Sequence, residues 1–288
     1  MEKINSLKDF NDLVSLFKES NPEIICNFPI NRGVFSKSIN EGTFFGCFYE
    51  NGLYFFIDED NYYVLYYIIQ KDSLLERIMV DKDVLINEAI IIKKERDDFE
   101  IKYDELLLNS NFEIESVNLQ FEINVDEKKE EIKKVISGSD SYFKKKDYWF
   151  EIKDMKENHD VIALWNDNLK KTDIPKEHYN SGKVLCVFDR NNQLIAVGWF
   201  NLLDKISEWR HVIVSNEHRD FSLALIMYYL WMEQALQHGI TKGIGWVEKE
   251  NKPSLAMNDV VGFKRNGRVS IQYVLKKEKM NYNVQEVN

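Results

Sequence analysis

The 288-residue sequence has no uninterrupted apolar run close to the roughly 20 residues that a membrane-spanning helix needs. Its first residues, MEKINSLKDFNDLVSLF, lack the charged segment and unbroken apolar segment of a secretory signal. Cysteine is scarce as well, since only Cys26, Cys47 and Cys186 are present, without a CxxC pair. An odd number of separated thiols is typical of a reducing compartment. We therefore expect a cytoplasmic protein without a structural metal and without a membrane partner.

The sequence also lacks an excess of positive charge, because the formal net charge is −10. Binding along a nucleic-acid backbone requires a stripe of lysine and arginine. The basic runs at 128–129 and 144–146 lie among acidic residues, so we interpret them as solvated surface. We expect no nucleic-acid partner, and net charge alone does not identify the substrate. The oligomeric state is not indicated by the sequence.

With 44% hydrophobic and 13% aromatic residues, the chain has enough apolar material for two domain cores. In the second half, β-rich runs at 184–188, 193–203 and 207–214 alternate with polar turns and predict an antiparallel meander. The apolar run 221–238, ended by Gly239, predicts a buried helix. A strand at 243–248, a short helix between Asn251 and Gly262, and a strand at 269–275 follow. An amphipathic helix is expected at 154–169.

The first half contains a weaker copy of this order. The segment 44–70 has turns at Asn51-Gly52 and 58–61, which predict a second three-strand meander. The runs 89–95 and 104–123 correspond to the later strand and helix–strand elements at an offset near 150 residues, which indicates a duplicated domain. We expect domains at 1–125 and 148–288, joined by a charged linker at 126–147 that contains one exposed helix. The fold class is mixed α/β, with a mostly antiparallel sheet flanked by helices in each domain.

The segment VSNEHRDFSLA at 214–224 joins the last strand of the second meander to its long helix. The first turn of a helix has backbone N–H groups without internal partners, and its dipole favours an anion there. Small residues at Ser222 and Ala224 would allow a pyrophosphate to approach, and Arg219 adds a permanent charge. Alone, the pattern R-x-x-S-x-A occurs by chance in many proteins, and an ordinary helix start is the simpler interpretation.

The order of meander, R-x-x-S-x-A, buried helix, strand, N-x-x-S-x-x-x-N-x-x-x-G-F and strand resembles the GCN5-related N-acetyltransferase (GNAT) family over about 148–276. In that family a V-x-P-x-x-R/Q-x-x-G-x-G/A segment cradles the pyrophosphate of acyl-CoA. Here Asn216 replaces the usual proline, Ser222 the usual first glycine and Ser254 a frequent alanine. The first half, 1–125, matches only as a degenerate tandem copy.

The resemblance implies an acyltransferase that uses acetyl-CoA and acetylates an amine of a small molecule or peptide. The cofactor-binding residues that it implies are Val212, Val214, Arg219, Asp220, Phe221, Ser222, Leu223, Ala224, Asn251 and Ser254. Backbone amides at 219–224 would face the pyrophosphate, and the backbone near Val212 and Val214 would pair with the pantetheine arm. Asn251 would contact a pantetheine amide, cap its helix, or do both.

Glu208 is the first candidate for the general base, because several members of the family carry a glutamate or histidine at this offset before the valine. The alternative is that Glu208 is an ion-pair partner for Arg210 or a solvated carboxylate. Strict alternation would place Glu208 on the face of Arg210, Val212 and Val214, and His211 on the other face. Asn258 stands where the family usually has a tyrosine acid. An amide hydrogen-bonds to a thiolate but does not protonate it.

Nothing in the first half resembles the R-x-x-G-x-G/A segment, so we expect that it has lost the cofactor cradle. Two other functions remain open. A catalytically inactive acyl-CoA-binding module is consistent with Asn258 and with the degenerate first half. An aminoacyl-tRNA-dependent peptidyl transferase is consistent with the duplication, although the net charge disfavours a tRNA partner.

Overall fold

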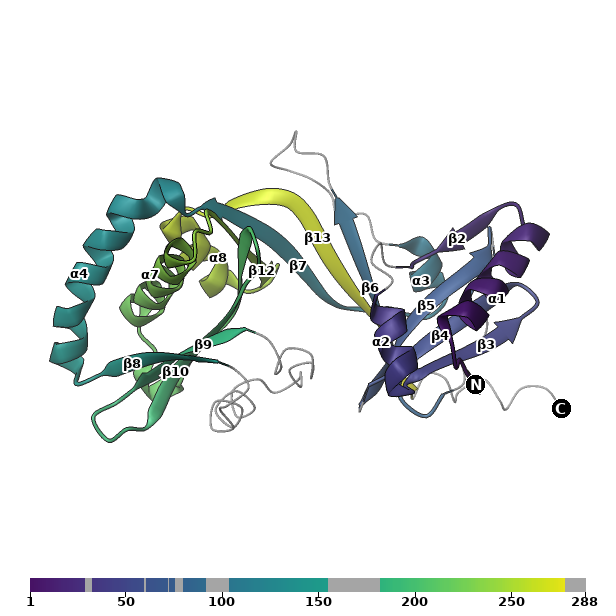
Figure 1. Ribbon diagram of the computed structural model, residues 1–288, viewed down its shortest axis with the longest axis horizontal. Coiled ribbons are helices and arrows are strands. Elements are labelled where there is room, and N and C mark those ends of the chain that lie inside the picture. The colour runs from purple at the N-terminus through teal and green to yellow at the C-terminus, as the bar shows by residue number, and fades with distance from the viewer. Residues whose placement is uncertain are drawn as a thin grey trace. The chain divides into compact units, whose positions relative to one another are not determined.

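The computed structural model describes residues 1–28, 33–59, 61–71, 73–75, 80–91, 104–154 and 182–277 (Figure 1). Its contacts group into two compact units. Unit 1 comprises Met1–Val117 and Val269–Asn288, and unit 2 comprises Asn118–Arg268. Both combine helices with a mostly antiparallel sheet, which confirms the mixed α/β class. None of the helices within the described ranges is both long and apolar enough to cross a bilayer.

Unit 1 is built on the meander that the turn residues predict. Strands β3 (Phe44–Tyr49), β4 (Gly52–Asp58) and β5 (Tyr62–Gln70) pair antiparallel in sequence order. Strand β1 (Glu2–Lys3) pairs with β3, and β6 (Asp83–Ile91) pairs parallel with β5. The unit also contains β2 (Ile24–Cys26), α1 (Leu7–Ser20), α2 (Gly33–Glu41) and α3 (Glu105–Asn109).

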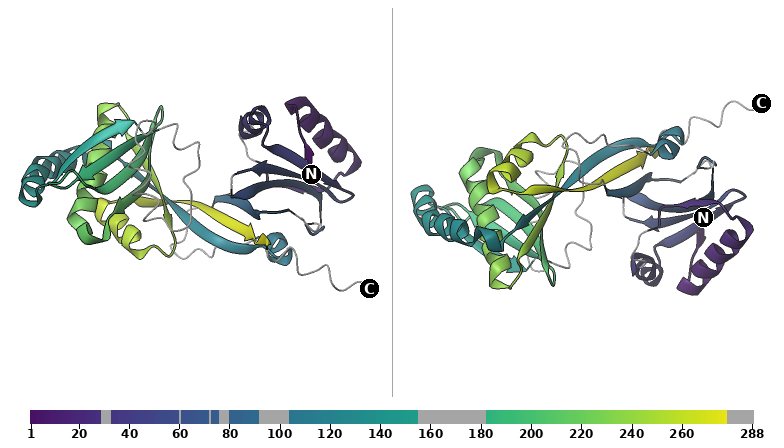
Figure 2. Two further views of the ribbon diagram at one scale, coloured as in Figure 1. Left: turned by 90° about the horizontal axis from the view of Figure 1, so that it is seen from below. Right: turned by 90° about the horizontal axis from the view of Figure 1, so that it is seen from above.

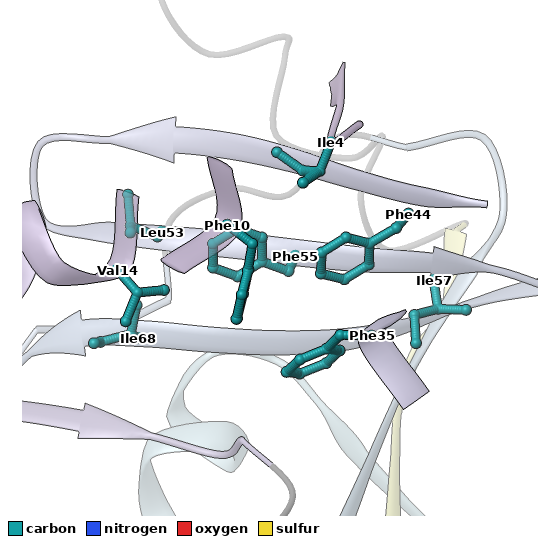
Figure 3. Packing of buried hydrophobic residues seen from close by; sticks show 9 residues of the cluster. All are labelled: Ile4, Phe10, Val14, Phe35, Phe44, Leu53, Phe55, Ile57 and Ile68. Carbon is teal, nitrogen blue, oxygen red and sulfur yellow. The ribbon is translucent and has the colours of Figure 1, made fainter. Parts of the chain in front are cut away.

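The aromatic residues of the first half form a core under α1 and α2. Phe10 of α1 is fully buried and lies 5.0 Å, ring to ring, from Phe35 of α2 and 4.9 Å from Phe55 of β4 (Figure 3). Phe44 stacks on Phe55 from the neighbouring strand. Burial of each such ring contributes about 2–3 kcal/mol, so this cluster stabilises the meander.

Unit 2 repeats the plan with longer helices. Strands β8 (Trp149–Asp154), β9 (Lys183–Phe188), β10 (Leu194–Leu202) and β11 (Ile206–Val214) pair antiparallel in sequence order. A 3-10 turn, η3 (Asn216–His218), leads into α7 (Phe221–Gln237), followed by β12 (Lys242–Glu248) and α8 (Lys252–Val261). These bounds confirm the predicted meander, buried helix and capped short helix. The helix expected at 154–169 lies, from residue 155 onward, outside the described residues.

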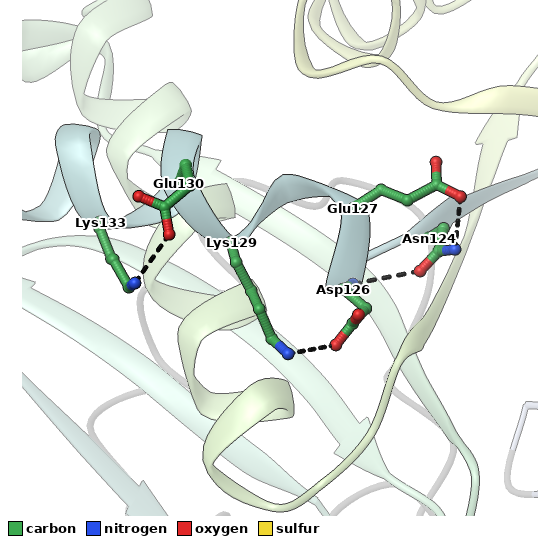
Figure 4. A network of polar contacts seen from close by, with 6 residues as sticks. All are labelled: Asn124, Asp126, Glu127, Lys129, Glu130 and Lys133. Carbon is green, nitrogen blue, oxygen red and sulfur yellow. Dashed lines mark hydrogen bonds and ion pairs between the residues drawn. The ribbon is translucent and has the colours of Figure 1, made fainter.

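The expected linker forms a helix that packs on unit 2. After the turn η1 (Asp126–Lys128), α4 (Lys129–Lys146) buries Ile132, Ser139 and Phe143 and contacts α7. Its first turns carry exposed ion pairs and a hydrogen-bonded turn at Asn124, drawn in Figure 4. Solvent-exposed pairs of this kind add little to stability, so apolar burial holds the helix in place.

The last strand of each half passes between the two units. Strand β7 (Glu113–Asn124) leaves unit 1 after Val117, and residues 118–124 pair antiparallel with β12 of unit 2. Strand β13 (Lys264–Leu275), yellow in Figures 1 and 2, belongs to unit 2 up to Arg268 and to unit 1 from Val269, and it is the neighbour of β6 in the sheet. The Lys277 amide donates a 2.8 Å hydrogen bond to the Asp83 carboxylate at this junction.

The two compact units therefore do not coincide with the two halves of the sequence. The domains expected at 1–125 and 148–288 are a proposal about how the chain was duplicated. The contacts instead show in which unit each segment packs. Each half contributes residues of its final strand to the other unit. Each unit is complete only with a strand from the other half.

Candidate functional site

Strands β11 and β12 pair over only part of their length. The parallel pairing runs from Ile206 opposite Lys242 to Trp209 opposite Gly245 and ends there. Strand β11 continues to Val214 with only β10 beside it, whereas β12 continues to Glu248 beside β7. The backbone edge of β11 beyond Trp209 thus has no strand partner among the described residues. Such an edge can accept an extended ligand as an added strand.

A bulge in β11 lies at the point where the two strands part. Trp199 of β10 is opposite His211, but Phe200 is opposite Trp209, so Arg210 is an extra residue. A bulge of this kind reverses the alternation of side chains along one strand. Glu208 is therefore on the same face as His211, and the sequence-based argument from strict alternation, which separated them, is wrong.

The two faces of the sheet in unit 2 have different neighbours. Trp209 packs toward α7, where its ring lies 5.2 Å from that of Trp231. On the opposite face, the ring of His211 stacks 6.3 Å from that of Trp199. The Arg210 guanidinium lies 5.6 Å from the Trp199 ring centroid. The face with Glu208 thus combines a carboxylate, a guanidinium and an imidazole.

Glu208 is a buried carboxylate, with only 6% of its surface exposed. Its Oε2 forms an ion pair at 2.6 Å with Nη2 of Arg210. Burial raises the pKa of Glu208 above its ordinary value, although Arg210 and hydrogen bonds from Asn201 and Trp246 oppose the shift. A carboxylate with a raised pKa at the point of strand parting is suited to accept a proton.

The amino end of α7 is capped by a carboxylate of the segment itself. Asp220 Oδ1 accepts a 2.8 Å hydrogen bond from the Ser222 amide. Asp220 Oδ2 accepts one from the Tyr142 hydroxyl at 3.1 Å and lies 3.5 Å from Nζ of Lys146. Burial acts to raise the pKa of Asp220, but the Ser222 amide, Tyr142 and Lys146 outweigh it, so the pKa is lowered. Asp220 is therefore ionised at neutral pH.

The structure brings the predicted cradle residues together at one end of α7 but does not leave all their amides available. The Ala224 amide donates to the Asp220 carbonyl as part of the helix, and the Ser222 amide is bonded to the Asp220 carboxylate. Arg219 and Phe221 are exposed, and Leu223 is buried. A diphosphate at this helix end would compete with the carboxylate of Asp220 for the Ser222 amide.

The resemblance also implies cofactor-binding residues on β11 and at the start of α8. Val212 is half-buried and Val214 is buried on the part of β11 that lies beyond its pairing with β12. Asn251 caps α8, since its Oδ1 accepts a 3.2 Å hydrogen bond from the amide of Ser254. The capping role expected for Asn251 is thus confirmed, and its pantetheine contact stays a prediction.

Asn258 is 2% exposed and faces α7 rather than solvent. Its Oδ1 accepts a 3.4 Å hydrogen bond from the hydroxyl of Tyr228, whose pKa burial raises to about 12. The Tyr228 ring also packs 5.0 Å from that of Trp209, the last residue of β11 that pairs with β12. A phenol thus lies beside the position where the family usually has its tyrosine.

The sequence did not indicate Tyr142, Lys146 or Tyr148 as neighbours of the helix start. Tyr148 Oη lies 2.8 Å from Nδ1 of His218, just before α7. Tyr142 and Lys146 come from α4, and Lys146 belongs to the basic run interpreted as solvated surface. Their spacing of four residues is the available signal, because it places both side chains on one helix face.

No known protein-family model matches this sequence. No curated protein matches it either. The structure is similar to solved structures at low sequence identity. One is a tandem GNAT protein from the clavulanic acid biosynthesis pathway, with a TM-score of 0.50, 9% identity and coverage of 79% of each chain.

A second similar structure is an acetyltransferase from the GNAT family of Colwellia psychrerythraea, with a TM-score of 0.47 and 15% identity over 96% of this chain and 99% of that one. A third is a GCN5-related N-acetyltransferase from Kribbella flavida, with a TM-score of 0.47 and 11% identity over 85% and 96%. At such identities a likeness concerns the fold alone. The chain has a GNAT-like fold, like that of a tandem GNAT protein.

Proposed function

We propose that the chain is an acyl-CoA-dependent N-acyltransferase whose single working site lies in unit 2. The observation that carries the proposal is the parting of β11 from β12 directly beyond Trp209 and Gly245, with the buried carboxylate of Glu208 beside it. This arrangement combines a strand edge without a partner among the described residues, a proton acceptor and a helix amino end in one unit.

The free edge of β11 fits a pantetheine arm. Pantetheine contains two amides in an extended chain, and backbone N–H and C=O groups near Val212 and Val214 can pair with them as another strand would. The diphosphate at the other end of acyl-CoA would meet both favourable and unfavourable groups. The amino end of α7 and Arg219 favour a diphosphate, and Asp220 opposes it by its charge and by its bond to Ser222.

In the proposed reaction, bound acyl-CoA supplies the acyl group, and the residues of this chain orient the amine and accept its proton. Glu208 acts as the base, directly or through one water, because its raised pKa brings it closer to neutrality. The Arg210 guanidinium holds the Glu208 carboxylate in place through their ion pair. The acceptor that we propose is an amine of a small molecule or a peptide, and acetyl is the acyl group.

A second candidate function is acyl-CoA binding without turnover. Two observations favour it: the buried amide of Asn258 in place of a tyrosine, and the Asp220 carboxylate at the helix end. In such a module the unpaired edge of β11 would be retained for binding, and no proton transfer would be needed. Both functions predict acetyl-CoA binding, so turnover is the property that separates them.

The test combines calorimetry with a thiol-release assay. The transferase predicts that the full chain binds acetyl-CoA and releases CoA thiol with an amine from a panel. A Glu208→Gln variant should retain binding and lose release. Binding without release by the wild-type chain on every amine would support the module. Unchanged acetyl-CoA affinity in Arg219→Glu would contradict the placement of the diphosphate.

We further propose that the protein acts in the cytoplasm, where thiols stay reduced. Cys26, Cys47 and Cys186 are all free. Mass determination of free thiols in protein purified from its native source tests this placement.

A further inference from the structure

Strands β5 and β6 of unit 1 part just as β11 and β12 do. Their parallel pairing runs from Tyr62 opposite Asp83 to Val64 opposite Leu85, whereas β5 continues to Gln70. Strand β4 pairs with β5 along one edge as far as Ile69. Beyond Val64, β6 therefore no longer pairs with this edge of β5.

A segment of the chain itself occupies that edge. Strand β2 pairs antiparallel with the end of β5, with Ile24 opposite Gln70 and Cys26 opposite Ile68. Because β4 occupies the other edge along this stretch, β2 lies on the edge that β6 leaves. Figure 1 shows β2 as a short strand beside β5.

Asn27 extends this pairing toward the point where β5 and β6 part. Its side-chain carbonyl accepts a 2.6 Å hydrogen bond from the Tyr67 amide, and its Nδ2 donates at 3.1 Å to the Leu65 carbonyl. Its own backbone amide donates at 3.3 Å to the Tyr67 carbonyl. One asparagine thus supplies the amide donors and the acceptor that an extended amide ligand would offer.

Contacts at both ends hold the segment 24–27 in place. Before it, the Lys71 amide donates to the Glu23 carbonyl at 3.0 Å, and the side chains of these two residues form an ion pair at 3.0 Å. After it, the ring of Phe28 lies 5.6 Å from Phe10 and 5.7 Å from Phe35 in the aromatic core. An anchored segment pairs with β5 at little further entropic cost, whereas a free ligand loses its own freedom on binding.

The connection between β5 and β6 is shorter than a counterpart of α7 would need. Strand β5 ends at Gln70 and β6 begins at Asp83, so only the residues 71–82 connect them. Helix α7 alone has 17 residues. A helix as long as α7 does not fit between β5 and β6.

We propose that residues 24–27 are a built-in occupant of the strand edge of unit 1, equivalent to the edge that binds acyl-CoA in unit 2. The tandem chain therefore binds one acyl-CoA, and β5 stays closed to an extended amide ligand. The assignment of the equivalent edge in unit 2 rests on the proposed function. The pairing of residues 24–27 with β5 is tested in the absence of ligand, so this test does not depend on the proposed function.

The experiment is hydrogen–deuterium exchange on the full chain, followed by mass spectrometry. In the wild-type protein, β5 amides at 65–70 should exchange slowly without ligand and should not respond to CoA. Asn27→Ala removes the acceptor of the Tyr67 amide and should speed exchange at 65–70 on the order of tenfold. Asn27→Asp keeps that acceptor but loses the donor to Leu65, so an intermediate change is expected.

The matched control is Asn5→Ala, an exposed asparagine of unit 1 that bonds to the Lys3 carbonyl. It should leave exchange at 65–70 unchanged, and melting curves should show that every variant is folded. Exchange at 65–70 that does not change in Asn27→Ala would overturn the proposal. So would protection of 65–70 by CoA in the wild-type chain. If CoA fails to protect 210–214, the proposed function fails, while the result at Asn27 is unaffected.

Discussion

The Asp220 carboxylate at the amino end of α7 gives the sharpest test of where a diphosphate binds. Asp220→Asn removes one negative charge but keeps an oxygen that accepts from the Ser222 amide. Asparagine and aspartate cap helices about equally well, so the start of α7 should be preserved. The cost in stability is the lost attraction to the helix dipole, about 0.3–1 kcal/mol. The variant therefore changes charge with little change in structure.

The expected gain in affinity follows from the exposure of the site. Two unit charges 4 Å apart interact by about 1 kcal/mol in water and about 4 kcal/mol at an effective dielectric constant of 20. The Asp220 side chain is 31% exposed and has Lys146 beside it, so the lower value applies. Removal of about 1 kcal/mol of repulsion should tighten CoA binding about fivefold.

Isothermal titration calorimetry with CoA and with pantetheine measures this effect. Pantetheine lacks the diphosphate, so Asp220→Asn should leave its affinity unchanged while that of CoA rises. Asp126→Asn is the matched control, because it removes the same charge near the start of α4, where Asp126 pairs with Lys129. Equal or weaker CoA binding by Asp220→Asn would refute the placement of the diphosphate at this helix end.

Three further predictions concern the base, a helix end and the thiols. Glu208→Gln should lower thiol release by about 10²–10⁴-fold. Because burial raises the pKa of Glu208, wild-type release should decline as pH falls through a value above 4.5, and a pH–rate profile that lacks this step would exclude Glu208 as the base. Gly262 ends α8 at φ 91°, so Gly262→Ala should lower the free energy of unfolding by about 1 kcal/mol. Gly138 lies inside α4 with nothing within 4 Å of an added Cβ, so Gly138→Ala should raise the free energy of unfolding slightly. Denaturant titration measures both effects. Burial raises the pKa of Cys186 to about 12, so a thiol reagent should label exposed Cys26 in the folded protein and leave Cys186 unmodified until the protein unfolds.

The elements that the sequence predicted are those defined by local chemistry. The turn at Asn51-Gly52, the long apolar run of α7 and the cap at Asn251 each depend on neighbours along the chain. The exchange of β7 and β13 depends on which of two similar edges a strand pairs with. A sequence with two related halves gives both edges nearly the same pattern, so periodicity does not distinguish them.

The resemblance singled out Glu208 and the start of α7, and their roles stay predictions. The structure adds the geometry around them, which the sequence did not indicate. The bulge at Arg210 reverses the side chains beyond it, and no turn residue marks it in the sequence. Asp220 acts as the helix cap, which propensity favours, but its bonds to Tyr142 and Lys146 join segments that are distant along the chain.

The exchange of final strands has a consequence for the order of events during synthesis. Residues 269–275 are synthesised after residues 118–268 of unit 2, and they supply the strand beside β6 in unit 1. The sheet of unit 1 is therefore finished only after unit 2 has been synthesised, although the aromatic core of unit 1 can collapse earlier. A nascent chain paused within unit 2 would still lack the strand that lies beside β6, and synthesis of residues 269–275 would supply it.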